Sequence, residues 1–182
     1  PQHRGLAFLL AEVVVVAEVL AGEPAQLVDR RLAQIRFLAE QGVDQPLDPV
    51  APAEARVLEI GGGDCLNSIA FAAAYPGSQV CGFDLSQAAI ADGLAIVAGA
   101  GLHNVELVVE DILRATERYP AGSFDYVIAH GVYAWVPDEV REAAMALVGH
   151  VLSDRGVGFI SYNVSAGGHV RRFLREMLRE AL

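Results

Sequence analysis

The residues with the clearest chemical potential form a glycine-rich segment at positions 59–65. The segment reads Glu-Ile-Gly-Gly-Gly-Asp-Cys, and it joins an apolar run to a stretch of helical character. Glycines are needed where a backbone turns sharply and approaches a ligand closely. The helix that follows presents free N–H groups and the positive end of its dipole to an anion. The segment therefore predicts a ligand-binding loop between a strand and a helix, although a tight turn without a ligand also fits these glycines.

The spacing of the glycines argues against a dinucleotide site, because the G-x-G-x-x-G pattern needs a glycine where Leu66 stands. Two acids close later apolar runs. Asp84 lies about twenty residues beyond the loop, a separation at which a carboxylate can accept hydrogen bonds from ribose hydroxyls. Asp111 follows the next run, and both acids are expected at the carboxyl edge of one parallel sheet, where such folds bind ligands. Asp125 is predicted to be only a turn or edge residue.

The segment Glu59-Ile60-Gly61-Gly62-Gly63 resembles the first motif of class I S-adenosylmethionine-dependent methyltransferases, and the resemblance continues through residues 55–182. It implies that S-adenosyl-L-methionine is the cofactor and that Asp111 accepts a hydrogen bond from the adenine amino group. For Asn67, a contact with the amino-acid end of the cofactor and a simple role at the helix N-terminus remain alternatives. The resemblance implies the following cofactor-binding residues: Glu59, Gly61, Gly62, Gly63, Asn67, Asp84, Leu85, Asp111, Ile112 and His130.

A closer resemblance is carried by residues 129–137, which read Ala-His-Gly-Val-Tyr-Ala-Trp-Val-Pro, together with residues 157–163. These segments look like a bacterial branch of the class in which a methyltransferase regulatory domain follows the catalytic domain. Rickettsial outer-membrane-protein lysine methyltransferases are among its members. The branch implies a protein side chain or a small metabolite as methyl acceptor. DNA is not expected, because the sequence has no Asn/Asp-Pro-Pro-Tyr/Phe motif.

His130 and Tyr133 are the predicted catalytic residues. Methyl transfer is an in-line displacement, so catalysis needs the lone pair of the acceptor aligned on the methyl carbon. His130 is expected at the end of the fourth strand, where its imidazole could remove a proton or orient the nucleophile, or simply hold the loop. Tyr133 and Trp135 could line an aromatic pocket, or could pack the loop on the following helix.

The elements that must position these residues alternate between short apolar runs and longer helical stretches. Such alternation is typical of βαβ units and predicts an α/β, Rossmann-like, doubly wound and mostly parallel sheet. The predicted strands are 56–60, 79–83, 105–109, 124–129 and 157–162. The predicted helices are 67–75, 87–100, a short one near 112–118, and 138–152, with a further amphipathic stretch at 169–182.

Residues 1–50 are predicted to form a helical extension and linker, and residues 51–182 the methyltransferase core. Leu6–Leu20 has alanines and glutamates that favour a helix, although Val13–Val16 is a β-branched run that favours a strand. We expect the helix. The sixth and seventh strands of the class are not found before Leu182. The fifth strand is therefore expected at an exposed edge, which a dimer partner or a further domain would cover.

The composition excludes several other functions. The 182 residues carry 13 basic and 23 acidic side chains and no lysine, which excludes Schiff-base and P-loop chemistry and a general nucleic-acid surface. The two cysteines, Cys65 and Cys81, have no metal-site spacing, and no metal is expected. The longest apolar stretch, Leu6–Ala21, is interrupted by glutamates, so neither a membrane span nor a membrane partner is expected. We expect a cytoplasmic enzyme. Because Cys65 replaces a glycine common in the family, a non-catalytic cofactor-binding or scaffold domain is the alternative.

Overall fold

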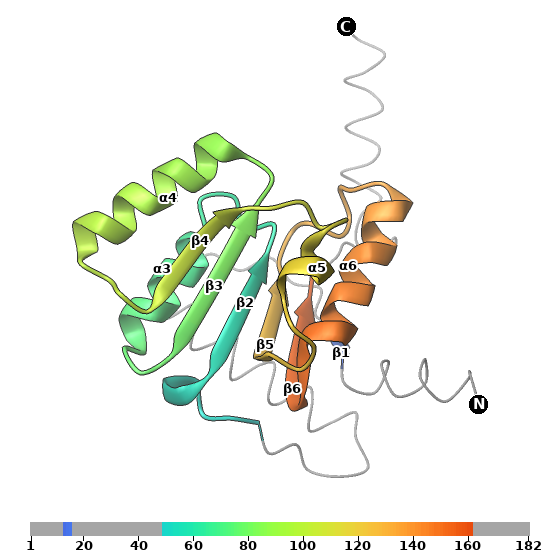
Figure 1. Ribbon diagram of the computed structural model, residues 1–182, viewed down its shortest axis with the longest axis horizontal. Coiled ribbons are helices and arrows are strands. Elements are labelled where there is room, and N and C mark those ends of the chain that lie inside the picture. Colours follow the sequence, from blue (N-terminus) through green and yellow to red (C-terminus); the bar gives the residue numbers. More distant parts are fainter. Residues whose placement is uncertain (1–12, 16–48, 162–182) are drawn as a thin grey trace, which may run out of the picture.

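The computed structural model describes residues 13–15 and 49–161, which form a parallel sheet with helices on both faces (Figure 1). The strand order is β1-β6-β5-β2-β3-β4, and every pairing in this sheet is parallel. The strands are β1 (Val13–Val15), β2 (Arg56–Ile60), β3 (Gln79–Asp84), β4 (Val105–Val109), β5 (Phe124–Ala129) and β6 (Leu152–Ile160). The helices are the short 3-10 turn η1 (Pro52–Glu54), then α3 (Leu66–Ala74), α4 (Gln87–Ala100), α5 (Ala115–Arg118) and α6 (Asp138–Val151). The predicted doubly wound, Rossmann-like fold is confirmed.

The order of the strands places a topological switch point between β2 and β5. From β2 the chain builds outward through β3 to β4, and it then returns to the other side of β2 to form β5 and β6. In folds of this kind, ligands bind beyond the carboxyl ends of the strands at the switch point. In Figure 1 the arrowheads of β2 to β6 point to the same upper edge, so the loops that follow β2, β3, β4 and β5 gather there.

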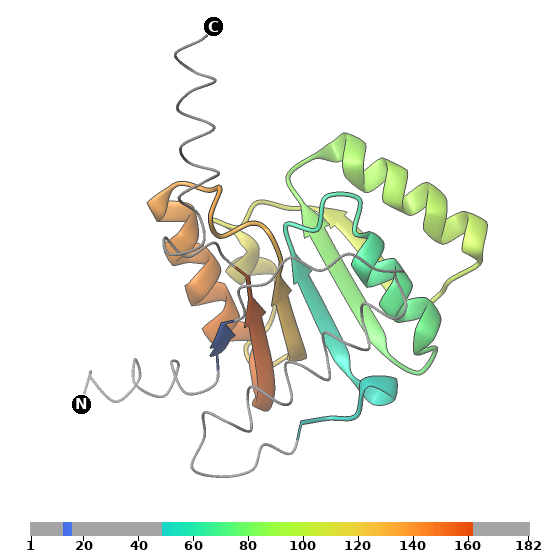
Figure 2. The same cartoon turned by 180° about the vertical axis from the view of Figure 1, so that it is seen from behind.

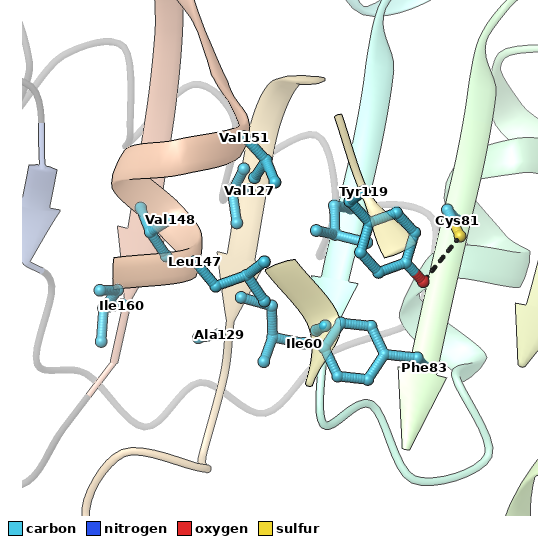
Figure 3. Packing of buried hydrophobic residues seen from close by; sticks show 12 residues of the cluster. Ile60, Cys81, Phe83, Tyr119, Val127, Ala129, Leu147, Val148, Val151 and Ile160 are labelled. Carbon is cyan, nitrogen blue, oxygen red and sulfur yellow. Dashed lines mark hydrogen bonds between the residues drawn. The ribbon is translucent and has the colours of Figure 1, made fainter. Parts of the chain in front are cut away.

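Alternation along each strand divides the core into two layers, because successive side chains of a strand point to opposite faces of the sheet. On the α3 face, seen toward the viewer in Figure 2, the buried cluster is Ala55, Val57, Phe71, Ala72, Val80, Tyr126, Val157 and Phe159. On the α6 face, the cluster includes Leu58, Ile60, Cys81, Phe83, Tyr119, Val127, Ala129, Leu147, Val148, Val151 and Ile160 (Figure 3). Burial of both faces of the central strands explains why they read as nearly continuous apolar runs in the sequence.

The expected helix at Leu6–Leu20 is wrong at Val13–Val15, which form β1. This strand pairs with β6 in parallel, with Val13 opposite Gly158 and Val15 opposite Ile160. Three consecutive β-branched residues fit a pleated strand better than a helix, and pairing supplies the backbone hydrogen bonds that decide between the two. β6 therefore lies between β1 and β5, and the expectation that this strand is an exposed edge is also wrong. The rest of the predicted N-terminal extension lies outside the described residues, as does the stretch 169–182.

The boundaries of β2, β4, β5 and α4 agree with the predicted ranges, whereas β6 begins five residues earlier than predicted. Residues 154–156 lie inside this strand, and Tyr162, the last residue of the predicted range, lies outside the described residues. Two contacts extend the strand: Leu152 pairs with Phe124, and the Ser153 hydroxyl donates to Asp125 Oδ1 at 2.9 Å. α5 is shorter than predicted and spans four residues.

Asp125 is a buried ion-pair partner rather than the predicted turn or edge residue. Its side chain is 5% exposed, and it accepts hydrogen bonds from the backbone N–H of Arg56 at 3.0 Å and from the Arg56 guanidinium at 2.9 and 3.0 Å. Burial alone would raise the pKa of Asp125, but the hydrogen bonds from Arg56 and Ser153 outweigh it, so the pKa lies below its ordinary value. This ion pair joins the amino ends of β2 and β5, at the edge opposite the predicted site.

Candidate cofactor and acceptor site

The glycine-rich segment is a tight loop between β2 and α3 that is tied to the end of β3. The backbone has positive φ at Gly61 (63°) and Gly63 (62°), conformations that glycine adopts without strain. The Gly62 N–H donates to the Phe83 carbonyl at 3.1 Å, and the Gly63 N–H donates to Asp84 Oδ2 at 2.9 Å. The predicted ligand loop and the predicted ribose-binding acid are therefore in direct contact.

The surroundings of the glycines differ in a way that matters for a ligand. A Cβ built on Gly61 would lie 2.5 Å from Val132 Cγ2, and one built on Gly62 would lie 2.9 Å from the carboxyl carbon of Glu59. A Cβ built on Gly63 would meet no atom within 4 Å. The loop is thus packed on its protein side at Gly61 and Gly62 and open at Gly63. This is what close approach of a ligand to the backbone requires.

Glu59 holds the loop to the first turn of α3. It is 2% exposed, and its carboxylate accepts hydrogen bonds from Asn67 Nδ2 at 3.0 Å, from the Ser68 N–H at 3.1 Å and from the Ser68 hydroxyl at 2.6 Å. A buried carboxylate is stable only with such partners. The contact favours a structural role for the Asn67 amide nitrogen at the start of the helix. A contact of either residue with the cofactor stays a prediction.

Cys65 lies beneath the loop and not on its ligand side. Its side chain is fully buried among Ile69, Ile90, Val97 and Leu107, and its backbone has the positive φ of 56° that a glycine would adopt more easily. Burial, followed by the nearby negative charges of Glu59 and Asp84, raises the pKa of the Cys65 thiol to about 12. The residue is therefore inert as a nucleophile.

Asp84 and Asp111 end neighbouring strands, and the loops that carry them are hydrogen-bonded to each other. Asp84 Oδ1 accepts from the Ser86 N–H at 2.8 Å, and the Asp84 carbonyl accepts from the Glu110 N–H at 3.1 Å. Asp111 Oδ1 accepts from the Leu113 N–H at 3.0 Å. A carboxylate has about four acceptor positions, so both acids keep acceptor capacity for a ligand. Ser86 also caps α4, because its hydroxyl accepts a hydrogen bond from the Ala89 N–H at 3.3 Å.

The two apolar members of the predicted cofactor set lie beside these acids. Leu85 is 70% exposed, an unusual degree for a leucine between a buried strand and a helix. Ile112 is partly buried and packs against the α6-side core. Leu85 thus offers an uncovered apolar surface at the same edge as Asp84 and the open face of Gly63.

His130 and Tyr133 lie in the loop that follows β5 and contacts the glycine loop through Val132. The His130 ring lies 6.2 Å from the Phe159 ring, centroid to centroid, and its Nδ1 lies 2.8 Å from the Ser161 hydroxyl oxygen. Tyr133 is partly buried against the α6-side core, and Trp135 is 64% exposed. Packing of the loop on the helix thus applies more to Tyr133 than to Trp135. The catalytic roles of His130 and Tyr133 stay predictions.

Two further residues contribute to the site and were missed in the sequence. Gly93 lies in the middle of α4, where a Cβ would be 2.3 Å from the Asp64 carbonyl oxygen, so the helix touches the glycine loop through this residue. Ser161 contacts both His130 and the Gly131 N–H. A glycine inside a helix is a recognised sign of close packing and could have been noticed. A serine at the end of a strand carries no such sign.

Two negative findings apply to residues 13–15 and 49–161. No group of three or more His, Cys, Asp or Glu side chains is arranged to hold a metal ion within these ranges. No helix of this part of the chain is long and apolar enough to cross a bilayer.

Comparison with known proteins agrees with this site. A family described as a methyltransferase domain matches residues 57–156, which is more than half of the chain. The uncharacterised protein RP028 of Rickettsia prowazekii is 39% identical over 132 residues, which cover 72% of this chain and 52% of RP028.

Solved structures give the same result. The structure of PKMT2 from Rickettsia typhi in complex with AdoHcy has a TM-score of 0.71 at 34% identity, covering 86% of this chain and 28% of PKMT2. A SAM-dependent methyltransferase from Aquifex aeolicus shares the fold, with a TM-score of 0.53 at 14% identity, over 72% of this chain and 63% of its own. The chain therefore spans about half of RP028 and less than a third of PKMT2.

The family match, the likeness to an AdoHcy-bound relative and the open glycine loop beside Asp84 agree with one another. The cofactor is S-adenosyl-L-methionine. The chain belongs to the class I S-adenosylmethionine-dependent methyltransferases.

Proposed function

We propose that the protein transfers the methyl group of S-adenosylmethionine to an N, O or C nucleophile of a protein side chain or a small metabolite. The observation that carries the proposal is the joined loop pair at the carboxyl edge. The open backbone of Gly63 is held by the carboxylate of Asp84 at 2.9 Å, with the exposed Leu85 beside it. These groups fit a nucleoside: Asp84 offers acceptor oxygens for hydroxyl groups, and Leu85 offers an apolar surface for a base.

The residues of the chain have separate tasks in this proposal. Asp84 accepts from the ribose hydroxyls, and Asp111 accepts from the adenine amino group. The glycine loop lets the cofactor approach the backbone, and Glu59 keeps that loop fixed against α3. The bound cofactor supplies an electrophilic methyl group on a sulfonium. His130 and Tyr133 then orient the acceptor, so that proximity and alignment provide much of the rate.

Calorimetry with S-adenosylmethionine and S-adenosylhomocysteine tests the cofactor site. Asp84→Asn keeps one acceptor oxygen and the size of the side chain but removes the charge, so we expect affinity to fall about tenfold or more because charge-assisted hydrogen bonds are lost. Asp154→Asn is the matched control, since Asp154 is exposed in the first half of β6, and its affinity should equal that of the wild type. Equal affinity of Asp84→Asn and the wild type would contradict the assignment.

The acceptor class is tested by transfer of a labelled methyl group from the cofactor into a bacterial extract divided into macromolecules and small molecules. Label in protein that is lost in His130→Gln would support a protein side chain as acceptor. Because residues 1–182 contain no lysine, any lysine acceptor must belong to another part or another protein. Cofactor binding without transfer to either fraction would instead favour a non-catalytic domain.

A further inference from the structure

Two loops meet at the switch point of the sheet: the glycine loop after β2 and the loop 130–137 after β5, which carries the predicted catalytic residues and is called the acceptor loop below. β2 and β5 are neighbouring parallel strands, and their register pairs Glu59 with Ile128 near the carboxyl ends. The two loops therefore start side by side. Val132, which is partly buried and lies four residues beyond Ile128, makes a contact between them.

The side chain of Val132 occupies the space that a side chain at Gly61 would need. A Cβ built on Gly61 would lie 2.5 Å from Val132 Cγ2, 3.3 Å from Cγ1 and 3.5 Å from Cβ. A Cβ built on Gly63 would meet no atom of the described residues within 4 Å. The bare backbone of Gly61 is thus covered by the acceptor loop, whereas the bare backbone of Gly63 is open to a ligand. Two glycines of one loop therefore serve different contacts.

The backbone around Val132 forms a closed turn. The Val132 carbonyl accepts from the Trp135 N–H at 2.9 Å. The far side of the turn is fixed to α6, because Arg141 Nε donates to the Val136 carbonyl at 3.0 Å. Val132 therefore closes the turn through its carbonyl and joins the turn to the glycine loop through its side chain.

We propose that Val132 is a positioning residue for methyl transfer, which sets how closely the acceptor loop approaches the glycine loop. The inference rests on the proposed function and deepens it. Methyl transfer needs the nucleophile in line with the methyl group, and a misplacement of about 1 Å can lower a rate about 100-fold. Val132 touches the glycine loop at Gly61 and not at the open Gly63, so it acts on the alignment of the acceptor more than on the affinity for the cofactor.

A double-mutant cycle tests the contact in the 182-residue chain without cofactor. Gly61→Ala places a Cβ against Val132 Cγ2, whereas in the Val132→Ala background Cβ of residue 132 remains at 3.5 Å, an ordinary contact. The strain of a positive φ at position 61 is common to both backgrounds and cancels in the cycle. We expect Gly61→Ala to lower the melting temperature by at least about 2 °C more with Val132 present than in the Val132→Ala background. Equal losses would overturn the contact.

Nuclear Overhauser effects provide a second measurement of the contact, which needs no variant to fold. The methyl protons of Val132 and the Hα protons of Gly61 should show such effects in the wild-type chain. Their absence would overturn the proposal.

Transfer of the labelled methyl group tests the positioning role. Val132→Ala should lower transfer at least about tenfold, while the calorimetric affinity for S-adenosylhomocysteine changes by less than about twofold. Val132→Thr keeps the γ-methyl group that lies nearest to Gly61 and should restore most of the transfer. Val140→Ala is the matched control, because Val140 is also a partly buried valine but lies in the first turn of α6, beyond the acceptor loop. Wild-type transfer in a folded Val132→Ala, or an equal loss in Val140→Ala, would refute the role of Val132.

The same measurements separate this inference from the proposed function. A wild-type chain that binds no S-adenosylhomocysteine, or that transfers no methyl group, would refute the proposed function even if the cycle shows the expected coupling between positions 61 and 132. Normal binding and transfer without that coupling would refute only the role of Val132.

Discussion

Gly93 connects the helix α4 to the cofactor loop, and replacing it with alanine should harm cofactor binding although the residue touches no predicted ligand atom. A Cβ at this position would lie 2.3 Å from the Asp64 carbonyl oxygen and 2.8 Å from Leu107 Cδ1. Ordinary contacts of this kind begin near 3.4 Å. The Asp64 carbonyl would therefore have to move by about 1 Å, and it is a backbone atom of the loop that cannot rotate away.

The magnitude follows from the cost of overpacking a well-packed site, which is about 1–3 kcal/mol. If the loop needs its present conformation to bind the cofactor, the same cost lowers the cofactor affinity by about 5- to 150-fold. Alanine is more favourable than glycine in a helix by about 0.5–1 kcal/mol. This gain offsets part of the loss in folding stability, but it does not restore the loop conformation or the cofactor affinity that depends on it.

Gly99→Ala is the matched control for this experiment. Gly99 lies in the same helix, is exposed, and a Cβ there would meet no atom within 4 Å. This variant should gain up to about 1 kcal/mol of stability, a rise of about 3 °C in the melting temperature, with unchanged cofactor affinity. Calorimetric affinity for S-adenosylhomocysteine and thermal unfolding should be measured for both variants. Wild-type affinity in Gly93→Ala, with the expected gain in Gly99→Ala, would refute the contact between α4 and the loop.

Three further predictions concern buried polar groups. Glu59→Ala should destabilise the fold by about 3 kcal/mol and weaken cofactor binding, because it leaves buried donors in the first turn of α3 without their acceptor. Denaturant unfolding measures the loss of stability, and calorimetry measures the loss of cofactor affinity. The pKa of Asp125 lies below its ordinary value of 3.8, so its ion pair with Arg56 should stabilise the fold above that pH and be lost as the pH falls through the folded-state pKa. Unfolding measured between pH 2 and 7 should show a shallower acid limb in Asp125→Asn, and identical acid limbs would contradict the assignment. Cys65 and Cys81 are buried and their thiol pKa values are raised, so neither should react with iodoacetamide at pH 8 until the chain is unfolded. Mass spectrometry of the alkylated protein measures this reaction. Rapid alkylation of the native chain would contradict the buried packing of these thiols.

The sheet was largely predictable because its signals are local. Five of its six strands follow from apolar runs bounded by turn residues. The bounds of β2, β4 and β5 agree with prediction to the residue, whereas β6 begins five residues earlier than predicted. The cofactor loop was predictable for the same reason, since its glycines and the following helix are adjacent in sequence. β1 was wrongly expected to be helical, because alanine-rich flanks outweighed three valines whose strand pairing partner lies 145 residues further along the chain.

The sequence by itself determined the chemistry of the site: which acids end the strands, where glycines leave the backbone without a side chain, and the absence of any lysine in these 182 residues. Only the tertiary structure decided how these groups are held. It placed Asp84 on the Gly63 N–H, Gly93 against the Asp64 carbonyl and Ser161 against His130. The last pair is 31 residues apart and each member lies at the end of a different strand. Such contacts depend on strand register and helix packing, which involve distant residues and leave no local pattern in the sequence.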